Sequence, residues 1–521
     1  MSNISALPKW PPQVLLEAGR NIFVTRDARD YALGHGIVYR ALPTEEGGLP
    51  PQDTTIHAPT TIVPTPFPRV LFEKAQKIQP LFNRLYAKVA MDDEFLASVM
   101  KDSVIKVDDF QRRLFDIWRT VKEEGLSQPM HLGLFRSDYL MHEEADGYLD
   151  IRQVEFNTIS SSFGALSSRV SQMHHHLLQI GAYSAGHPCL LAENMPKNEA
   201  LDTLAAGLAD GHRYYVEQAS KAGRKVQPAI LFIVQPEERN TFDQRAIEHV
   251  LSEKYNIPVL RAPLDHLSTQ ASLHGNDRVL VMHSPLSLTP TEISVVYFRA
   301  GYSPTDYHNE TEWDVRLMLE RSYAIKCPTI ALQLAGAKKV QQVLAEPDVL
   351  ERFMGSNAHD IRFTFSQLWP LDDSPLGREA MSLVHEDPTK YVMKPQREGG
   401  SNNIYKEDIL PALEAMEKRD KDRADRGEDA SVKEREGYIL MSLIHTPKDR
   451  GSMMLRAGHG DVAEHVSDTV SELGIYGTAL FGPDAEESFR DGGFLLRTKA
   501  SASNEGGVAV GFSVIDTPVL V

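Results

Sequence analysis

A strand-like run that opens into a small polar loop is the feature that most limits what this chain can fold into. The apolar residues Tyr391-Val392-Met393 lead into Lys394-Pro395-Gln396-Arg397-Glu398-Gly399-Gly400-Ser401-Asn402-Asn403. Glycines let backbone N–H groups approach an anion closely. Lys394 and Arg397 supply positive charge, and Glu398 can hold a metal ion. The pattern indicates a loop that covers phosphates, and the alternative is an ordinary polar surface turn.

Composition limits the ligand class and the compartment. The 521 residues carry a formal net charge of −17, so we expect no broad nucleic-acid surface, and local basic groups or metal must hold an anionic ligand. No apolar run reaches the roughly 20 residues that span a membrane, and no signal peptide is visible. Cys189 and Cys327 are too few for a disulfide framework, which fits a reducing cytoplasm. Each cysteine is expected to pack in the interior, with a catalytic role as the alternative.

Several segments are expected to provide structure rather than chemistry. Apolar residues at helical spacing predict helices over 69–100 and 108–125, each with one buried stripe. Residues 11–41 predict a short helix followed by loop and strand, and 43–68 predict a long surface connection. The charge-rich residues 417–437 predict a mobile, solvated insertion, to which we assign no function.

A second polar pattern follows two expected strands, 132–138 and 150–157. Glu155 and Asn157 are two residues apart, so a strand puts both side chains on one face, where their oxygens can share Mg²⁺. An exposed strand face is the alternative. The turn at 158–164 offers hydroxyl and N–H groups that could bind a carboxylate at the start of a helix over 164–181. The three histidines 174–176 point different ways on that helix and cannot all bind one metal.

Residues 226–335 are predicted to form an α/β subdomain. The apolar run 229–234 is typical of a buried parallel strand, and further strands at 257–261, 278–282 and 293–298 alternate with helices. Ligands bind at the carboxyl ends of such strands, and solvated loop ends are the alternative. Two groups of side chains follow those ends and are candidates for binding a small, multiply charged substrate: Glu238, Asn240 and Gln244, and Arg299 and Tyr302.

Six motifs occur in one order along the chain and together resemble the eukaryotic glutathione synthetase family. They are Arg136-Ser137-Asp138-Tyr139, Gln153-Val154-Glu155-Phe156-Asn157-Thr158, Glu238-Arg239-Asn240 through Gln244, 394–403, Ser471-Glu472-Leu473-Gly474 and Leu496-Arg497-Thr498-Lys499. The resemblance extends from about residue 10 to the C-terminus. It implies a cytoplasmic homodimer that joins γ-glutamylcysteine to glycine, using ATP with two Mg²⁺ ions, through an acyl phosphate.

The resemblance also implies a fold and a domain organisation. The fold class is α/β (α+β), an ATP-grasp fold with an inserted α/β substrate-binding subdomain and a mobile glycine-rich lid. Residues 1–225 and 336–521 would form the catalytic body, with the lid at about 394–417, and 226–335 would form the inserted subdomain. A second, alanine-rich lid would contain Gly506-Gly507.

Site residues are carried over from the family by position. The implied Mg²⁺ ligands are Glu155, Asn157 and Glu398, and the implied catalytic cations are Arg136, Arg497, Lys338 and Lys394. The implied ATP contacts are Glu155, Lys338, Lys394, Glu398, Gly399, Gly400, Asn403, Tyr405, Met441, Ile444, Glu472, Lys499 and Glu505. The implied peptide-substrate contacts are Arg136, Ser160, Ser162, Glu238, Asn240, Gln244, Arg299, Tyr302, Arg497, Val508 and Ala509. Without the resemblance, Lys338 would be read as part of the solvated face of a helix over 331–346.

Some positions depart from the family pattern. Ser401 stands where the lid commonly has a third glycine, and serine disfavours the positive φ that glycine allows. Ser442 and Leu443 stand where charged residues are frequent beside the adenine. Leu140 replaces a methionine, and Glu505 replaces an aspartate. The alternatives to a glutathione synthetase are a sister ligase that uses β-alanine or serine, and a nucleotide-binding scaffold without activity.

Overall fold

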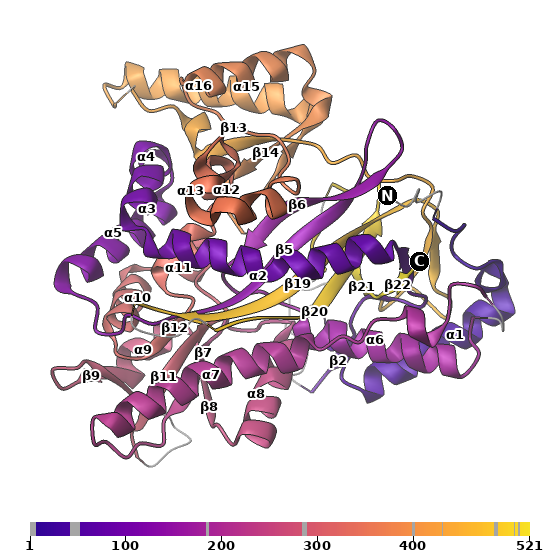
Figure 1. Cartoon of the computed structure of the whole chain (residues 1–521), viewed down its shortest axis with the longest axis horizontal. Coiled ribbons are helices and arrows are strands. Elements are labelled where there is room, and N and C mark those ends of the chain that lie inside the picture. Colours follow the sequence, from indigo (N-terminus) through magenta and orange to yellow (C-terminus); the bar gives the residue numbers. More distant parts are fainter. Residues whose placement is uncertain are drawn as a thin grey trace.

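A large mixed sheet runs through the middle of the protein in this computed structural model (Figure 1). The structure describes residues 7–41, 53–183, 187–283, 289–398, 402–429, 431–483, 488–504, 506–508 and 511–521. Among these residues, the sheet has 14 strands. No helix in the described ranges is long and apolar enough to cross a membrane.

Four antiparallel strands form the centre of this sheet. They are β5 (His131–Glu143), β6 (Leu149–Asn157), β19 (Thr469–Phe481) and β20 (Ser488–Ala500), in the order β6-β5-β19-β20. Helix α2 (Arg69–Met91) packs on one face, where Phe82 joins a core with Phe135 and Tyr139. Helices α6 (Gly164–Gln179) and α7 (Ala200–Lys221) pack on the other. Alternate side chains of β5 therefore pack into two separate cores, one on each face of the sheet.

The predicted α/β segment extends this same sheet. Strands β8 (Val259–Ala262), β7 (Ala229–Ile233), β11 (Thr291–Phe298) and β12 (Ile325–Cys327) are parallel, and β12 pairs with β5 at Lys326 and His131. Helix α8 (Thr241–Tyr255) connects β7 to β8. The strand expected at 278–282 is β10 (Val279–Met282), but it pairs antiparallel with β9 (Ala271–His274) and β11, so it is not part of a βαβ unit. The division into a body and an inserted subdomain stays a prediction.

A smaller sheet carries the glycine-rich loop. Its four strands run in the order β13 (Leu368–Pro370), β16 (Tyr438–Ser442), β14 (Tyr391–Pro395) and β15 (Ile404–Tyr405). Helices α15 (Pro375–Glu386) and α16 (Ile409–Asp425) belong to this region, drawn in orange at one end of the molecule (Figure 1). It has its own apolar core, which includes Trp369, Met393 and Leu413.

The charge-rich segment is more ordered than the sequence suggested. The segment 417–437, expected to be a mobile insertion, begins as the last turns of α16. Ion pairs join it to itself and to Asp373. Arg419 contacts Glu434 through two hydrogen bonds of 2.7 Å, and Lys433 contacts Asp373 at 2.7 Å. Lysine, arginine and glutamate are good helix formers, so low apolar content did not end the helix.

The N-terminal region also differs from expectation. Helix α1 (Ala18–Gly34) is longer than predicted. The surface connection predicted over 43–68 is wrong for its second half, where Ile62 and Val63 are fully buried. Strands β2 (Thr55–His57), β3 (Thr60–Thr61) and β4 (Thr65–Phe67) pair with β1 (Val38–Arg40), with β17 (Ser452–Leu455) and β21 (Ser513–Asp516), and with β22 (Pro518–Leu520), respectively. Most of these partners are distant in sequence, so local composition could not reveal them.

The remaining elements complete the packing around the large sheet. Helices α3 (Asp93–Val99) and α5 (Asp109–Glu124) follow α2, and both begin with an aspartate N-cap. The other α-helices are α4 (Ile105–Val107), α9 (Leu264–Gln270), α10 (Glu310–Arg321), α11 (Ile330–Ala335), α12 (Lys338–Ala345), α13 (Val349–Met354) and α14 (His359–Arg362). The other strand is β18 (Glu464–Val466).

Candidate active site

Four polar side chains meet where β5 pairs with β6. Arg136 and Asp138 are two residues apart on β5, and their partners on β6 are Asn157 and Glu155. Glu155 is 9 % and Asn157 7 % exposed, so the alternative of an exposed strand face is wrong. The spacing of two residues on each strand places all four side chains on one face of the sheet.

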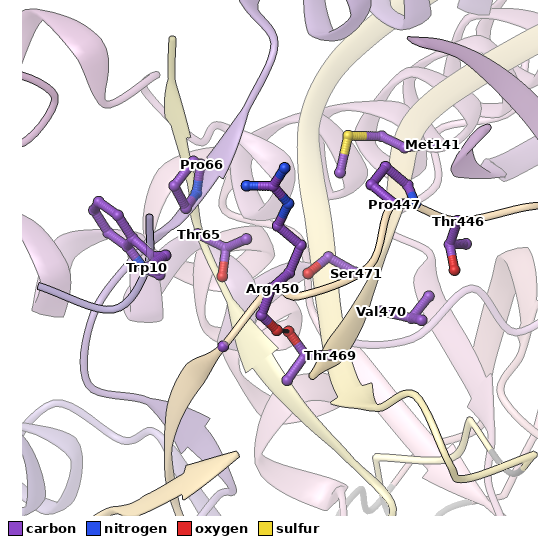
Figure 2. Close-up of a pocket in the computed structure, with 11 residues that line it drawn as sticks. Trp10, Thr65, Pro66, Met141, Thr446, Pro447, Arg450, Thr469, Val470 and Ser471 are labelled. Atoms are coloured by element: carbon purple, nitrogen blue, oxygen red, sulfur yellow. Dashed lines mark hydrogen bonds between the residues drawn. The ribbon is translucent and has the colours of Figure 1, made fainter. Parts of the chain in front are cut away.

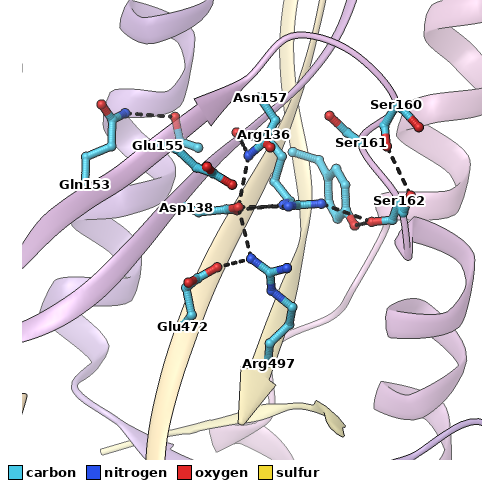
Figure 3. Close-up of polar contacts among 12 residues, drawn as sticks. Arg136, Asp138, Gln153, Glu155, Asn157, Ser160, Ser161, Ser162, Glu472 and Arg497 are labelled. Carbon is cyan, nitrogen blue, oxygen red and sulfur yellow. Dashed lines mark hydrogen bonds and ion pairs between the residues drawn. The ribbon is translucent and has the colours of Figure 1, made fainter. Parts of the chain in front are cut away.

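Asp138 is the centre of this group (Figure 3). Its carboxylate accepts two hydrogen bonds from Arg136, Nε to Oδ1 at 2.6 Å and Nη2 to Oδ2 at 2.8 Å. Asn157 Nδ2 and Arg497 Nη2 also donate to Oδ2, at 2.9 and 3.2 Å. Arg497 makes a further ion pair with Glu472. Sequence reasoning did not single out Asp138, although its spacing of two from Arg136 was a usable signal.

A β-bulge in β6 brings a lysine of the glycine-rich region to this face. Asp138 pairs with Glu155 and Tyr139 with Gln153, so Val154 has no partner of its own. The Nζ atom of Lys394 donates a hydrogen bond of 3.0 Å to the carbonyl of Val154. Burial lowers the pKa of Lys394 to about 8, and the neighbouring charge of Lys338 acts in the same direction. The bulge explains why 150–157 does not alternate strictly in sequence.

Lys338, the first residue of α12, also contacts this charged face, at Glu155. The single helix expected at 331–346 is two helices, α11 and α12, separated by Gly336 and Ala337. A side chain at position 336 would collide with Thr158, which explains the glycine there. Lys338 Nζ is 2.9 Å from Glu155 Oε2 and 3.9 Å from Glu398 Oε2. Lys338 is only 4 % exposed, so its alternative role on a solvated helix face is wrong.

These contacts shift the pKa values of Glu155, Lys338 and Glu398. Burial alone would raise the pKa of Glu155, but Lys338 and Lys394 outweigh burial and lower that pKa. Burial would lower the pKa of Lys338, but Glu155 and Glu398 raise it. The pKa of Glu398 is raised by burial and by the charge of Glu155, although Lys338 opposes this.

A pocket of about 640 Å³ opens beside this charged face, between the two sheets. Its size is within the range of small-molecule sites. Leu140, Leu443 and Ile444 give it an apolar part. Five of the predicted ATP contacts or catalytic cations line it: Tyr405, Ile444, Glu472, Arg497 and Lys499.

The other predicted ATP contacts have different positions. Asn403 Nδ2 donates to the hydroxyl of Tyr405 at 3.2 Å, at the edge of the pocket. Met441 is buried within β16 and pairs with Val392. Gly399, Gly400, Ser401 and Glu505 lie outside the described residues.

A second cavity adjoins the pocket at Thr446, Pro447 and Val470 (Figure 2). Its volume is about 20 Å³, which is room for about one water molecule. It is therefore too small for a nucleotide or a peptide.

A turn between β6 and α6 connects Arg136 of β5 with Arg299, one of the residues that the sequence suggested for substrate binding. Arg299 Nη2 donates to Ser162 Oγ at 2.6 Å, and Ser160 Oγ donates to the carbonyl of Arg299 at 3.2 Å. The carbonyl of Ser162 accepts from Arg136 Nη1 at 3.2 Å and from the hydroxyl of Tyr476 at 2.6 Å. Arg136 and Arg299, from distant parts of the chain, therefore meet at one turn.

Several buried polar atoms near this turn have no hydrogen-bond partner within the described part of the chain. They are Nε and Nη1 of Arg299, Oδ1 of Asn240 and Nε2 of Gln244. These residues are at most 3 % exposed. Because buried polar groups without partners are costly, these atoms indicate a ligand that offers both hydrogen-bond donors and acceptors.

Other predicted substrate contacts lie further out. Tyr302 accepts a hydrogen bond of 3.3 Å from Gln235, and Glu238 lines a separate groove. Val508 is 1 % exposed and packs in the core on the α6 side of the sheet. Ala509 lies outside the described residues.

The start of α6 is not free to bind a substrate carboxylate. Asp243 of α8 already accepts hydrogen bonds there, from the N–H groups of Phe163 at 2.8 Å, Ala165 at 2.9 Å and Leu166 at 3.2 Å. These three N–H groups therefore already have an internal carboxylate as their partner, and the proposal that the turn binds a substrate carboxylate rests on its hydroxyl groups. Asp243 instead fixes the turn that carries Ser160 and Ser162.

The predicted metal ligands offer only oxygen donors. In the described ranges, no three histidine, cysteine, aspartate or glutamate side chains form a ready metal site. Mg²⁺ at nucleotide sites takes one or two carboxylates and completes its shell with phosphate oxygens and water. Glu155 and Glu398, which share Lys338, therefore fit a Mg²⁺ ion that arrives with a nucleotide, and the amide of Asn157 lies beside Asp138 on the same face.

The histidines and Cys327 agree with their expected structural roles, whereas Cys189, which was expected to pack in the interior, is only partly buried. His174 is buried against Thr61, whereas His176 contacts Asp27, so these side chains point apart. Cys327 is buried, and burial raises the pKa of its thiol, which disfavours a thiolate nucleophile.

Comparisons with known proteins give one consistent result. The model of the eukaryotic glutathione synthase ATP-binding domain matches residues 21–520. The glutathione synthetase large chain of Schizosaccharomyces pombe is 35 % identical over 527 residues, covering 98 % of this chain and 99 % of its own. The human glutathione synthetase is 38 % identical over 500 residues, covering 95 % and 96 %.

The tertiary structure also has a relative. A glutathione synthetase-like effector of Globodera pallida superposes with a TM-score of 0.71 over 98 % of both chains, at 21 % identity. This similarity concerns the fold alone, and it confirms the α/β fold class that the sequence predicted.

Proposed function

This chain belongs to the eukaryotic glutathione synthase family, and on that premise we propose how its residues carry out the reaction. The chain is an ATP-dependent ligase with the activity of a glutathione synthetase. It joins γ-glutamylcysteine to glycine and forms glutathione, ADP and phosphate. The assignments of individual residues below are proposals.

The reaction has two chemical steps. An oxygen of the cysteinyl carboxylate attacks the γ-phosphorus of ATP, which forms an acyl phosphate and releases ADP. The amine of glycine then attacks the acyl carbon, and phosphate leaves with one former carboxylate oxygen. Because activation comes from ATP, the protein needs no nucleophile of its own; it must align the groups, stabilise moving charge and exclude water.

We assign the cations by their position around Glu155 and Asp138. Lys338 and Lys394, whose charges both act on the Glu155 carboxylate, hold the ATP phosphates. Arg136 and Arg497 stabilise the negative charge that moves between carboxylate and phosphoryl oxygens. Glu155, Asn157 and Glu398 would hold Mg²⁺, which supplies positive charge to the phosphates when it is bound.

One observation carries this proposal: Asp138 joins Arg497, which lines the 640 Å³ pocket, to Arg136, which contacts the serine turn. The pocket fits a nucleotide, and the turn lies beside the unpartnered atoms of Arg299. Two arginines held by one carboxylate therefore lie between the proposed nucleotide side and the proposed peptide side. That is where the carboxylate and the γ-phosphate must meet.

The remaining contacts follow from the same division. We propose that Asn403, Tyr405, Ile444, Glu472 and Lys499 contact ATP. We propose that Ser160, Ser162, Asn240, Gln244, Arg299 and Tyr302 contact γ-glutamylcysteine. The homodimer, the second Mg²⁺ ion and the cytoplasmic location are proposals that rest on the family alone; two plant relatives are described as chloroplastic.

The test is product formation by the purified protein with ATP, Mg²⁺, γ-glutamylcysteine and a panel of amines. We expect one ADP, one phosphate and one glutathione per turnover with glycine. Faster turnover with β-alanine or serine would assign the chain to a sister ligase instead. No ADP release with any amine would indicate a scaffold without activity.

A further inference from the structure

We propose that Arg397 and Asp108 are positioning residues, which fix the place of Glu398 relative to Lys338 and the Mg²⁺-bound nucleotide. The ion pair joins the base of the glycine-rich loop to the start of helix α5. Neither residue belongs to the reacting groups described above. The inference rests on the proposed function of Glu398 as a metal ligand.

Successive side chains point in alternating directions where the chain leaves β14. Lys394 donates to Val154, Gln396 accepts from the N–H of Lys339 at 3.0 Å, and Glu398 lies 3.9 Å from Lys338. These three side chains, two residues apart, all point toward the face that holds Glu155 and Lys338. Arg397 lies between the last two and points away from that face.

Arg397 has a fixed set of partners on the other side. Its Nη1 atom donates to Asp108 Oδ2 and, at 2.7 Å, to the carbonyl of Gln396. Its guanidinium lies 5.8 Å from the centre of the Phe110 ring. Its own N–H donates to the carbonyl of Pro395 at 2.8 Å, which makes a tight turn directly before Glu398.

Asp108 is itself rigidly held. Its Oδ1 atom accepts from the N–H of Gln111 at 3.0 Å and so caps α5, while Oδ2 accepts from Arg397. The side chain of Asp108 is 9 % exposed and that of Arg397 28 % exposed, so the pair is shielded from solvent more than most surface ion pairs.

Gln396 anchors the same segment from the opposite side. Helix α12 has no cap from its own residue Ala337, and the Gln396 side chain accepts from the N–H of Lys339 instead. Gln396 is 1 % exposed. With Gln396 held on α12 and Arg397 held on α5, the backbone at Glu398 has little freedom. Partners outside the metal shell commonly tune metal affinity in this way.

The chain provides a matched control for the Asp108 carboxylate. Asp92 caps α3 through Oδ1, which accepts from the N–H of Phe95 at 2.9 Å, and its Oδ2 pairs with Arg352 at 2.5 Å. The guanidinium of Arg352 also lies near a phenylalanine ring, 5.7 Å from that of Phe95. Asparagine is as good a helix cap as aspartate. Asp108→Asn and Asp92→Asn therefore both keep the cap and remove one ion pair.

The experiment measures binding of a non-hydrolysable ATP analogue by calorimetry, with and without Mg²⁺, for the full-length wild type and the variants. We expect Asp108→Asn and Arg397→Met to weaken binding of the Mg²⁺-loaded analogue by about tenfold. Binding of the metal-free analogue and the KM for γ-glutamylcysteine should change less than about twofold. Arg397→Lys, which keeps the charge, should recover part of the affinity, and Asp92→Asn should match the wild type.

The possible failures are distinguishable. Equal affinities for Asp108→Asn and Asp92→Asn, with equal unfolding temperatures, would overturn the positioning role. An equal loss with and without Mg²⁺ would also overturn it, because the defect would then be a general one in nucleotide binding. A wild type that does not bind the Mg²⁺-loaded analogue would overturn the proposed function itself.

Discussion

The ammonium group of Lys394 donates a 3.0 Å hydrogen bond to the carbonyl of Val154, the residue that bulges out of β6. This contact connects the strand before the glycine-rich loop to the strand that carries Glu155 and Asn157. The bulge leaves Val154 without a paired residue on β5, and its carbonyl accepts from two side chains, Lys394 and, at 3.4 Å, Gln341. The lysine is therefore held beside the carboxylates before any phosphate arrives.

Replacing Lys394 tests its assignment to the phosphates. We expect Lys394→Met to raise the KM for ATP by about tenfold or more, because a hydrogen bond to a charged group is worth about 1.5–3 kcal/mol. The KM for γ-glutamylcysteine should change much less. Steady-state kinetics with each substrate varied in turn provide the measurement, and an unchanged KM for ATP would contradict the assignment.

The same lysine predicts a pH dependence. Burial lowers the pKa of Lys394 to about 8, so the side chain is charged at pH 7 and largely neutral at pH 9. Affinity for the ATP analogue should therefore fall as the pH rises through 8, by about tenfold between pH 7 and 9. Lys394→Arg, whose guanidinium stays charged, should lose this dependence. A wild-type affinity that is constant over this range would disprove the prediction.

Asp138→Asn should damage both stability and activity. The variant leaves Arg136 and Arg497 without the buried carboxylate that they share, and removing one partner of a buried pair costs about 3–5 kcal/mol. Chemical denaturation measures the loss of unfolding free energy, and phosphate release measures the activity. Asp461→Asn is the control, because Asp461 pairs with Arg26 and Arg29 at the exposed surface. This variant should change neither measurement. Wild-type stability in Asp138→Asn would contradict the role of Asp138 as the shared partner.

Glu398→Ala should abolish ligation and keep the fold. The Glu398 side chain is 21 % exposed, and its carboxylate lies 3.9 Å from Lys338 Nζ, so its removal creates no large cavity. We expect turnover to fall by about a hundredfold or more, since charge stabilisation in a transition state is commonly worth that much. The control is Glu428→Ala, another glutamate that pairs with a cation, Arg426, but outside the site. Full activity in Glu398→Ala would refute the metal assignment.

Local patterns in the sequence were sufficient for part of the site. The spacing of Glu155 and Asn157 placed both side chains on one strand face, and the order of the motifs pointed to the family. The strand before the glycine-rich loop and the helix over 108–125 were also predicted, and the helical character of 69–100 was predicted, although Asp92 divides it into α2 and α3. Each of these features depends on residues close together in the chain, where periodicity is informative.

The remaining features depend on long-range contacts. Asp138 gains its importance from Arg497, which is 359 residues away, and from strand pairing with Asn157. Asp243 occupies the start of α6, although 77 or more residues separate it from the groups that it caps. Residues 60–65 resemble a loop in composition, but distant strands bury them. No local periodicity encodes such contacts.

The most direct test of the account is the fate of the carboxylate oxygens. The protein would be supplied with ATP, Mg²⁺, glycine and γ-glutamylcysteine whose cysteinyl carboxylate carries ¹⁸O at both positions. An acyl phosphate that forms between Arg136 and Arg497 requires one ¹⁸O atom to leave in each phosphate and one to remain in the new amide, as measured by mass spectrometry. Unlabelled phosphate, released together with glutathione, would contradict the proposed activation of the carboxylate.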